Sequence, residues 1–72
     1  MTKHTVLIAD DHAVYRMGLR DLLEPEFKVI SEAMEGGEAV DKAAKAQPDV
    51  VVMDINMPVS YTHLTLPTIL RV

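Results

Sequence analysis

Three short apolar runs, separated by longer mixed segments, constrain the fold of this chain more than any other feature. Residues 5–9 (TVLIA), 27–31 (FKVIS) and 49–54 (DVVVMD) are rich in β-branched and other apolar side chains and have the length of strands. Near-continuous apolar runs are typical of buried parallel strands, and parallel strands need crossover connections that usually contain a helix. The sequence therefore predicts three parallel strands at these positions.

The two segments between the runs have helical character. In the first, apolar side chains and one glycine share a helix face: Tyr15, Gly18, Leu19, Leu22 and Leu23. Pro25 predicts that this helix ends near Leu23 or Glu24. The second, residues 38–46, is rich in alanine and ends before Pro48, and the EAMEGG segment before it is predicted to be a turn. The order β-α-β-α-β indicates an α/β fold with helices packed on a parallel sheet.

Composition limits the function classes. The chain has 72 residues, no cysteine and a formal net charge of −4. This length suits one small domain, and the absence of cysteine excludes disulfides, thiol nucleophiles and cysteine zinc sites. The negative charge argues against binding nucleic acid by charge alone, and no apolar run approaches the roughly 18 residues of a membrane span. We therefore expect a cytoplasmic domain with no membrane contact.

Carboxylates follow two of the predicted strands. Asp10 and Asp11 end the first, and Asp54 ends the third. Ligands of open parallel sheets bind beyond the carboxyl ends of the strands, so neighbouring first and third strands would place three acids in one crevice. Their mutual repulsion is relieved by a hard cation such as Mg²⁺, and one carboxylate could then attack a phosphoryl group. In the alternative interpretation, Asp10 or Asp11 caps the following helix and Asp54 only ends a strand. We expect His12 at the helix entrance, tuning or capping, rather than as a ligand.

Three stretches carry a family resemblance: VLIADDHAVYRMGLRDLLE, EAMEGGEAV and PDVVVMDINMP. Together they resemble the receiver domain of bacterial two-component response regulators, and the Asp-Asp-His start with its helix is similar to the NarL/LuxR-type subgroup. The similarity covers residues 4–58. It implies that residues 1–58 are part of a flavodoxin-like (CheY-like) doubly wound sheet, with the strand order 2-1-3.

The resemblance also implies roles for single residues. Asp54 matches the phosphoacceptor, which takes a phosphoryl group from a sensor histidine kinase. Asp10 and Asp11 match the pair that holds Mg²⁺, and Asn56 matches the position whose backbone carbonyl completes the metal's protein ligands. Such a domain is a phosphoacceptor and not a turnover enzyme. The full-length regulator would control transcription through a C-terminal helix-turn-helix domain absent from this chain.

The resemblance stops after Pro58. The family's Ser or Thr after its fourth strand and Lys after its fifth strand have no match in this sequence. We expect residues 59–72 to be an irregular, non-family tail of foreign origin, which leaves the third strand as an exposed edge. The alternative is a natural short variant. Continuous genomic sequence that contains the same tail would support this alternative and exclude a foreign origin.

Two other functions stay open. The chain could be an inert truncated fragment without phosphotransfer. It could also be an aspartyl phosphatase of the haloacid dehalogenase type, in which an aspartate nucleophile follows a buried strand. In this chain Asn56 stands where such enzymes carry a second acid, and an amide cannot act as a general acid.

Overall fold

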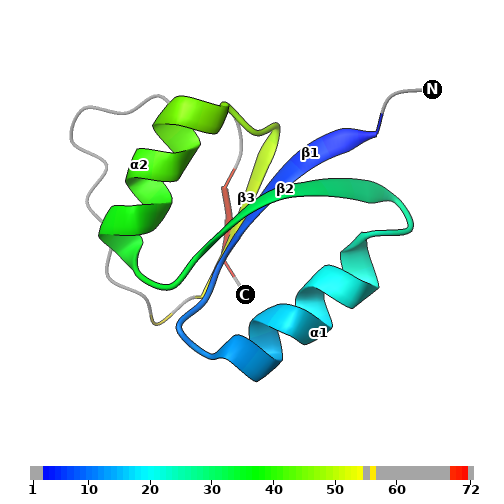
Figure 1. Cartoon of the computed structure of the whole chain (residues 1–72), viewed down its shortest axis with the longest axis horizontal. Coiled ribbons are helices and arrows are strands. Elements are labelled where there is room, and N and C mark those ends of the chain that lie inside the picture. The colour runs from blue at the N-terminus through cyan, green and yellow to red at the C-terminus, as the bar shows by residue number, and fades with distance from the viewer. Residues whose placement is uncertain (1–2, 55, 57–68, 72) are drawn as a thin grey trace.

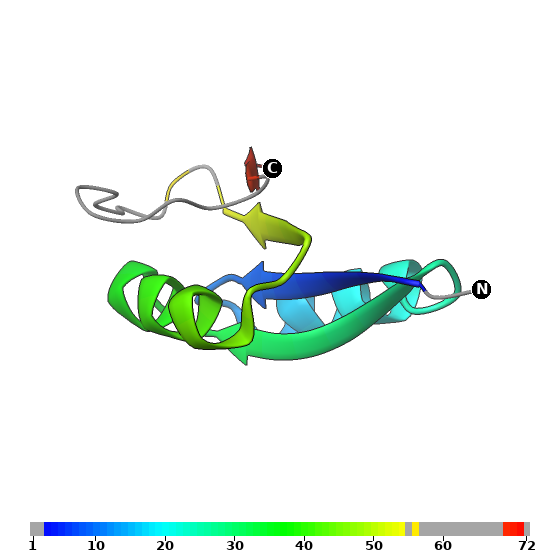
Figure 2. The ribbon, with the colours of Figure 1, turned by 90° about the horizontal axis from the view of Figure 1, so that it is seen from above.

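Strands and helices alternate along the chain (Figure 1). The computed structural model describes residues 3–54, 56 and 69–71. The elements are β1 (His4–Ala9), α1 (Ala13–Leu23), β2 (Phe27–Ala33), α2 (Gly36–Ala46), β3 (Val50–Met53) and β4 (Ile69–Arg71). They form a parallel sheet in the order β2-β1-β3-β4, which Figure 2 shows with β4 beyond β3. The predicted α/β class and the order 2-1-3 of the first three strands are confirmed.

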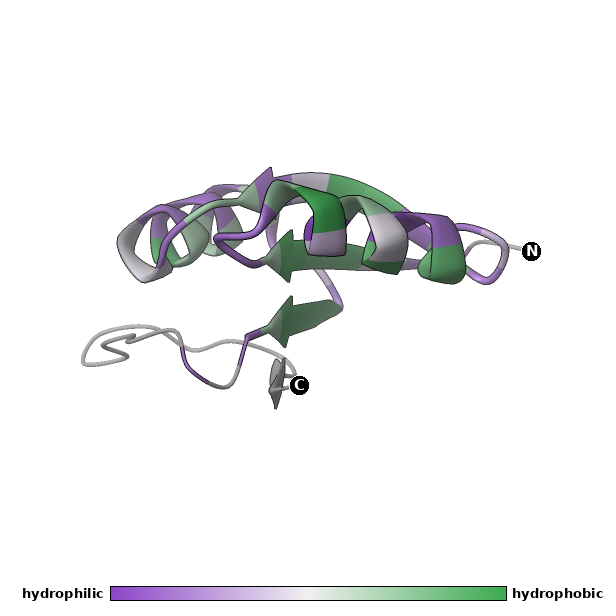
Figure 3. Ribbon diagram, turned by 90° about the horizontal axis from the view of Figure 1, so that it is seen from below, coloured by the Kyte–Doolittle hydropathy of each residue, from purple (hydrophilic) through white to green (hydrophobic). Residues whose placement is uncertain are grey.

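The two helices lie on opposite faces of the sheet, and each covers its own apolar core (Figure 1). The core beneath α2 consists of Leu7, Ala9, Ala33, Ala39, Ala43, Val51 and Met53. The core beneath α1 is built on Val6, Ile8 and Val52, with Leu19, Leu23, Phe27, Val29 and Val50 packed against it. In both cores the centre is formed by β1 and β3, which are the most apolar ribbons in Figure 3. Successive side chains of a strand point to opposite faces, so these strands are apolar throughout.

Helix α1 buries less of its apolar face than the sequence predicts. Leu19 and Leu23 pack against the sheet. Tyr15 and Leu22, however, are 53% and 74% exposed, so only part of the predicted apolar face is buried. The reason is geometric, because the helix rests on β1 and β2 through one edge of its apolar face. The other edge is exposed.

Helix α2 begins earlier than predicted. It starts at Gly36 rather than at residue 38, and β2 continues to Ala33, so only two residues join them. The Ala39 amide bonds the Glu35 carbonyl at 2.9 Å, and the Glu38 carboxylate accepts the Met34 amide at 2.6 Å. The first of these bonds is the first i→i−4 bond of the helix, and the second ties the residue before the N-cap Glu35 to the first helical turn.

The register between β1 and β2 changes partway along the pair. Val6 pairs with Val29 but Leu7 pairs with Ser31, so β2 contains one extra residue, Ile30. An extra residue reverses which face the following side chains occupy. As a result Glu32, the partner of Ile8, lies on the α1 face of the sheet.

A fourth strand covers part of β3. Ile69, Leu70 and Arg71 pair with Val51, Val52 and Met53. The expectation that the third strand has no neighbour is therefore wrong, and residues 69–71 are a strand where irregular structure was expected. Residues 57–68 and 72 lie outside the described residues, and the foreign origin of the tail stays a prediction. Neither described helix is long and apolar enough to cross a membrane.

Candidate metal centre

Backbone hydrogen bonds align the carboxyl ends of the three longer strands. The Asp54 amide donates to the Ala9 carbonyl at 3.1 Å, which extends the pairing of β3 with β1. The Asp10 amide donates to the Ala33 carbonyl at 3.0 Å, which does the same for β1 and β2. Asp10, Asp11 and Asp54 therefore all leave the sheet at one end, as expected for a site beyond the carboxyl ends of parallel strands.

The carboxylates of these three acids meet. Asp10, Asp11, Asp54 and His12 each offer one ligand atom, and these atoms lie within 4.8 Å of one another. Asp10 is buried, with only 2% of its surface exposed, whereas Asp54 is half-buried and Asp11 is exposed. Two of the four positions are therefore shielded from water, which strengthens any interaction with a cation.

The Asp10 carboxylate also has a local structural task. Its Oδ1 accepts a hydrogen bond from the His12 amide at 2.8 Å. His12 is the N-cap residue of α1, and its carbonyl accepts the Arg16 amide at 2.9 Å. Asp10 thus stabilises the turn that leads from β1 into α1, so the structural and the metal-binding interpretations of this acid are compatible.

His12 lies at the helix entrance, as predicted, but its side chain makes no capping hydrogen bond. Its Nδ1 lies 2.9 Å from Asp11 Oδ1 and 3.4 Å from Asp10 Oδ1. The imidazole is 75% exposed. The side chain of His12 thus contacts the two carboxylates and does not cap the helix.

Asn56 completes the group of predicted residues. Its backbone amide donates to Asp54 Oδ1 at 3.0 Å, which fixes the orientation of that carboxylate. A cleft of about 280 Å³ lies over the site and is lined by Asp11, His12, Met34, Glu35, Gly36, Asp54 and Asn56. The ligand roles of the four predicted residues, including the Asn56 carbonyl, stay predictions.

Sequence reasoning missed the contribution of the segment after β2. Met34, Glu35 and Gly36 line the cleft but were interpreted only as part of a turn. Their position gave a usable signal, because the loop after every parallel strand opens at the same end of the sheet.

The donor set suits a hard divalent cation. Three carboxylates supply oxygen ligands, and a main-chain carbonyl and waters are the usual complement for Mg²⁺. Three acids this close repel one another, and a cation would remove that repulsion. The residues present therefore fit the metal that the sequence analysis predicts.

Comparison with known proteins agrees with this geometry. A sequence model of the response regulator receiver domain matches residues 6–69, which extends beyond Pro58. Protein-glutamate methylesterase/protein-glutamine glutaminase 2 of Carboxydothermus hydrogenoformans is 48% identical over 77 residues, covering 94% of this chain and 22% of its own length.

Two solved structures share the fold. The signal receiver domain of the response regulator NarL from Mycobacterium tuberculosis aligns with a TM-score of 0.84 and 28% identity, over 96% of this chain and 64% of that chain. A chain in the crystal structure of the P1 domain of CheA3 in complex with CheY6 from R. sphaeroides aligns with a TM-score of 0.81 and 31% identity. The alignment covers 96% of this chain and 62% of that chain.

This chain thus spans about a fifth of the methylesterase and less than two thirds of either solved chain. The matched relative bears the name of a methylesterase and glutaminase and not that of a transcriptional regulator. The family match covers most of the sequence, and the acid pair, the acid after β3 and the order of the strands all agree with it. The chain belongs to the response regulator receiver domain family.

Proposed function

We propose that this chain is a phosphoacceptor in which Asp54 takes a phosphoryl group from the phosphohistidine of a sensor histidine kinase. Asp10, Asp11, Asp54 and the Asn56 backbone carbonyl would hold Mg²⁺. The observation that carries the proposal is the convergence of three carboxylates within 4.8 Å at the carboxyl end of a parallel sheet. Membership of the receiver family supports it.

In the transfer step a carboxylate oxygen of Asp54 forms a bond to phosphorus while the phosphorus–nitrogen bond of the donor breaks. The imidazole nitrogen that leaves takes up a proton. When bound, Mg²⁺ neutralises negative charge on the phosphoryl oxygens. The chain's own contribution is positioning: the Asn56 amide orients the Asp54 carboxylate, and the Ala9 carbonyl fixes the backbone of Asp54.

The product is an acyl phosphate that the chain carries as a signal, so we propose a phosphoacceptor rather than a turnover enzyme. Phosphatases of the haloacid dehalogenase type need a second acid two residues after the nucleophile. This chain has Asn56 at that position, and an amide side chain cannot act as a general acid. This argues against the phosphatase alternative.

The proposed partner is a kinase or phosphotransfer domain, and a chain from a complex of a CheA3 P1 domain with CheY6 shares this fold. We place the encounter in the cytoplasm. Transcriptional control would require a separate DNA-binding domain, and the relative with a methylesterase name supports a different output as the alternative.

The test is chemical labelling of the 72-residue chain with acetyl phosphate and Mg²⁺, followed by intact mass measurement and exposure to base. Asp54→Asn is the test variant, and Asp41→Asn, an exposed acid on α2, is the matched control. One base-labile phosphoryl group that is lost in Asp54→Asn and kept in Asp41→Asn supports the proposal.

Two results would overturn it. Continuous consumption of acetyl phosphate without stable labelling would favour the phosphatase. Absence of labelling in the folded chain would favour an inert fragment.

A further inference from the structure

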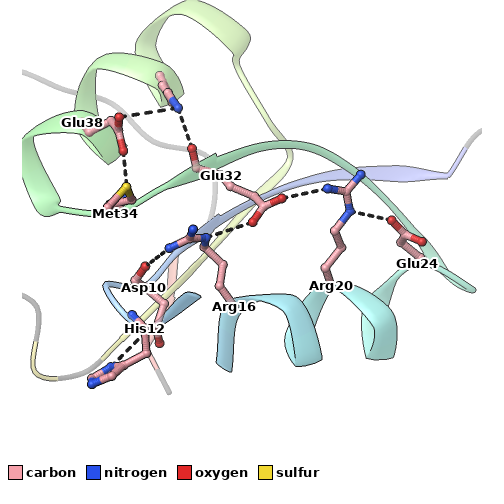
Figure 4. A network of polar contacts seen from close by, with 9 residues as sticks. Asp10, His12, Arg16, Arg20, Glu24, Glu32, Met34 and Glu38 are labelled. Atoms are coloured by element: carbon pink, nitrogen blue, oxygen red, sulfur yellow. Dashed lines mark hydrogen bonds and ion pairs between the residues drawn. The ribbon is translucent and has the colours of Figure 1, made fainter. Parts of the chain in front are cut away.

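A network of charged side chains joins α1 to the end of β2 behind the acid site (Figure 4). Arg16, one turn into α1, is its central member, and only 15% of its side chain is exposed. Its Nη1 donates to the Asp10 backbone carbonyl at 2.7 Å, and its Nε donates to Glu32 Oε1 at 2.9 Å. We infer that Arg16 is a positioning residue that holds the backbone of the acid pair in its metal-binding arrangement.

The carbonyl that Arg16 holds belongs to the peptide unit between Asp10 and Asp11. A peptide unit is planar, so holding its oxygen also holds the nitrogen and the Cα of Asp11, from which the Asp11 side chain leaves the backbone. A second hydrogen bond, from the His12 amide to the Asp10 carboxylate, secures the other side of the turn. Arg16 therefore acts on the spacing of both acids without touching either carboxylate.

Glu32 sets the position of Arg16. It lies on the α1 face because of the extra residue in β2, and its carboxylate is 30% exposed. Its second oxygen accepts Arg20 Nη1 at 2.8 Å, and its backbone carbonyl accepts Lys42 Nζ from α2 at 2.6 Å. Both helices thus bond the same residue of β2. A guanidinium held in this way by charge-assisted bonds loses little further freedom when it bonds a carbonyl.

Arg20 is a natural control. It is one turn further along α1 and also bonds Glu32, and its Nε bonds Glu24 at 2.7 Å. Its side chain is 47% exposed, and among the described residues its hydrogen bonds go to Glu24 and Glu32 and not to the β1–α1 turn. Loss of Arg20 weakens the docking of α1 on β2 but leaves the contact with the Asp10 carbonyl in place.

The metal part of the inference rests on the proposed function. Its test compares Arg16→Gln, Arg16→Lys and Arg20→Gln in the 72-residue chain. Mn²⁺ affinity is measured by electron paramagnetic resonance, and exchange of the His12 amide by NMR. We expect Arg16→Gln to weaken Mn²⁺ binding about tenfold, the lower limit for loss of an outer-shell partner. Arg16→Lys, which keeps one donor, should recover part of the affinity, and Arg20→Gln should match the parent chain.

The His12 amide gives a readout that does not need the metal. It should exchange faster in Arg16→Gln than in Arg20→Gln, because the turn that contains it is no longer held. If the parent chain binds no Mn²⁺, the proposed metal function fails. The exchange rate of the His12 amide then tests the positioning role of Arg16 by itself. If Mn²⁺ binds and both glutamine variants have equal affinity and equal exchange, the positioning role is overturned while the proposed function stands. If Arg16→Gln does not fold, the Mn²⁺ affinity and the His12 amide exchange of Arg16→Lys are compared with those of Arg20→Gln instead.

Discussion

The amide of Asp54 donates a hydrogen bond to the carbonyl of Ala9 at 3.1 Å, and this bond ties the end of β3 to the end of β1. The backbone thereby brings Asp54 to Asp10 and Asp11 despite the repulsion between their charges. Burial of Asp10 makes that repulsion stronger than it would be in water. The acid cluster is therefore expected to lower stability when no cation is present.

This relationship predicts opposite effects of one substitution with and without metal. In EDTA, Asp54→Asn should raise the free energy of unfolding by about 1 kcal/mol, because one of three close charges is removed and the amide oxygen can still accept the Asn56 amide. With Mg²⁺ at a hundred times its dissociation constant, the parent chain should gain about 2.7 kcal/mol and the variant much less. Urea unfolding in both buffers measures this. A parent chain whose stability is the same in both would contradict the prediction.

Substitution of Asp10 should change both stability and cation binding, whereas substitution of Asp11 should change mainly cation binding. Asp10 is buried and its carboxylate bonds the His12 amide, so Asp10→Ala should lower the free energy of unfolding by about 1–3 kcal/mol as well as weaken cation binding. Asp11 has 65% of its side chain exposed, so Asp11→Ala should weaken cation binding with little change in metal-free stability. Urea unfolding in EDTA separates the two variants. Equal stabilities would show that Asp10 has no structural task.

Small side chains let α2 lie close to the sheet. Ala43 is 1% exposed and packs in the core with Leu7 and Val51, whereas the neighbouring Ala44 is exposed. Ala43→Leu should therefore lower the free energy of unfolding by about 1–3 kcal/mol through overpacking, and Ala44→Leu should be close to neutral. Urea unfolding of the pair is the measurement, and similar values for both would refute the packing assigned to α2.

Much of the fold could be predicted because the strands that form its centre are apolar on both faces. The apolar runs of β1 and β3 place apolar side chains on both faces of the sheet. Both faces therefore have to be covered, and a helix packs on each. The extra residue in β2 could not be predicted. Ile30 has no feature in the sequence that distinguishes it from a regular strand residue, yet it decides which face Glu32 occupies.

The candidate site, like the fold, could be predicted only in part. The three acids could be predicted to meet because they follow strands and need only the correct strand order. The role of Arg16 could not, since its partners are a main-chain carbonyl and a residue sixteen positions away. A backbone acceptor leaves no signature in the sequence, and the contact between α1 and Glu32 depends on the register of β2.

Asp49 gives a prediction for acid solution. The Thr5 amide donates to its carboxylate at 2.9 Å, and this bond lowers the pKa of Asp49 below its ordinary value of 3.8. A group whose pKa is lower in the folded state stabilises the fold above its unfolded-state pKa, and this contribution disappears as the pH falls through the folded-state value. Asp49→Asn should therefore reduce the stability difference between pH 7 and pH 3. Urea unfolding at the two pH values tests this, with the exposed Asp41→Asn as control. An unchanged difference in Asp49→Asn would show that the Thr5 bond contributes nothing.

The exposed apolar edge of α1 predicts poor solubility. Val14 and Leu22 are 85% and 74% exposed, and they fall on one side of the helix. We expect the chain to self-associate and to lack a cooperative transition as a monomer above about 45 °C, the lower limit of ordinary domains. Leu22→Gln combined with Val14→Glu should reduce self-association in sedimentation velocity without lowering the free energy of unfolding.

Leu19→Gln is the matched control for this surface. Leu19 packs against the core beneath α1, so the same change that is harmless at Leu22 should lower stability by about 2 kcal/mol or more at this position. Circular dichroism during urea unfolding compares the two variants. If Leu22→Gln destabilises as much as Leu19→Gln, the outer edge of α1 must be packed in solution, and its exposure could not be the cause of self-association.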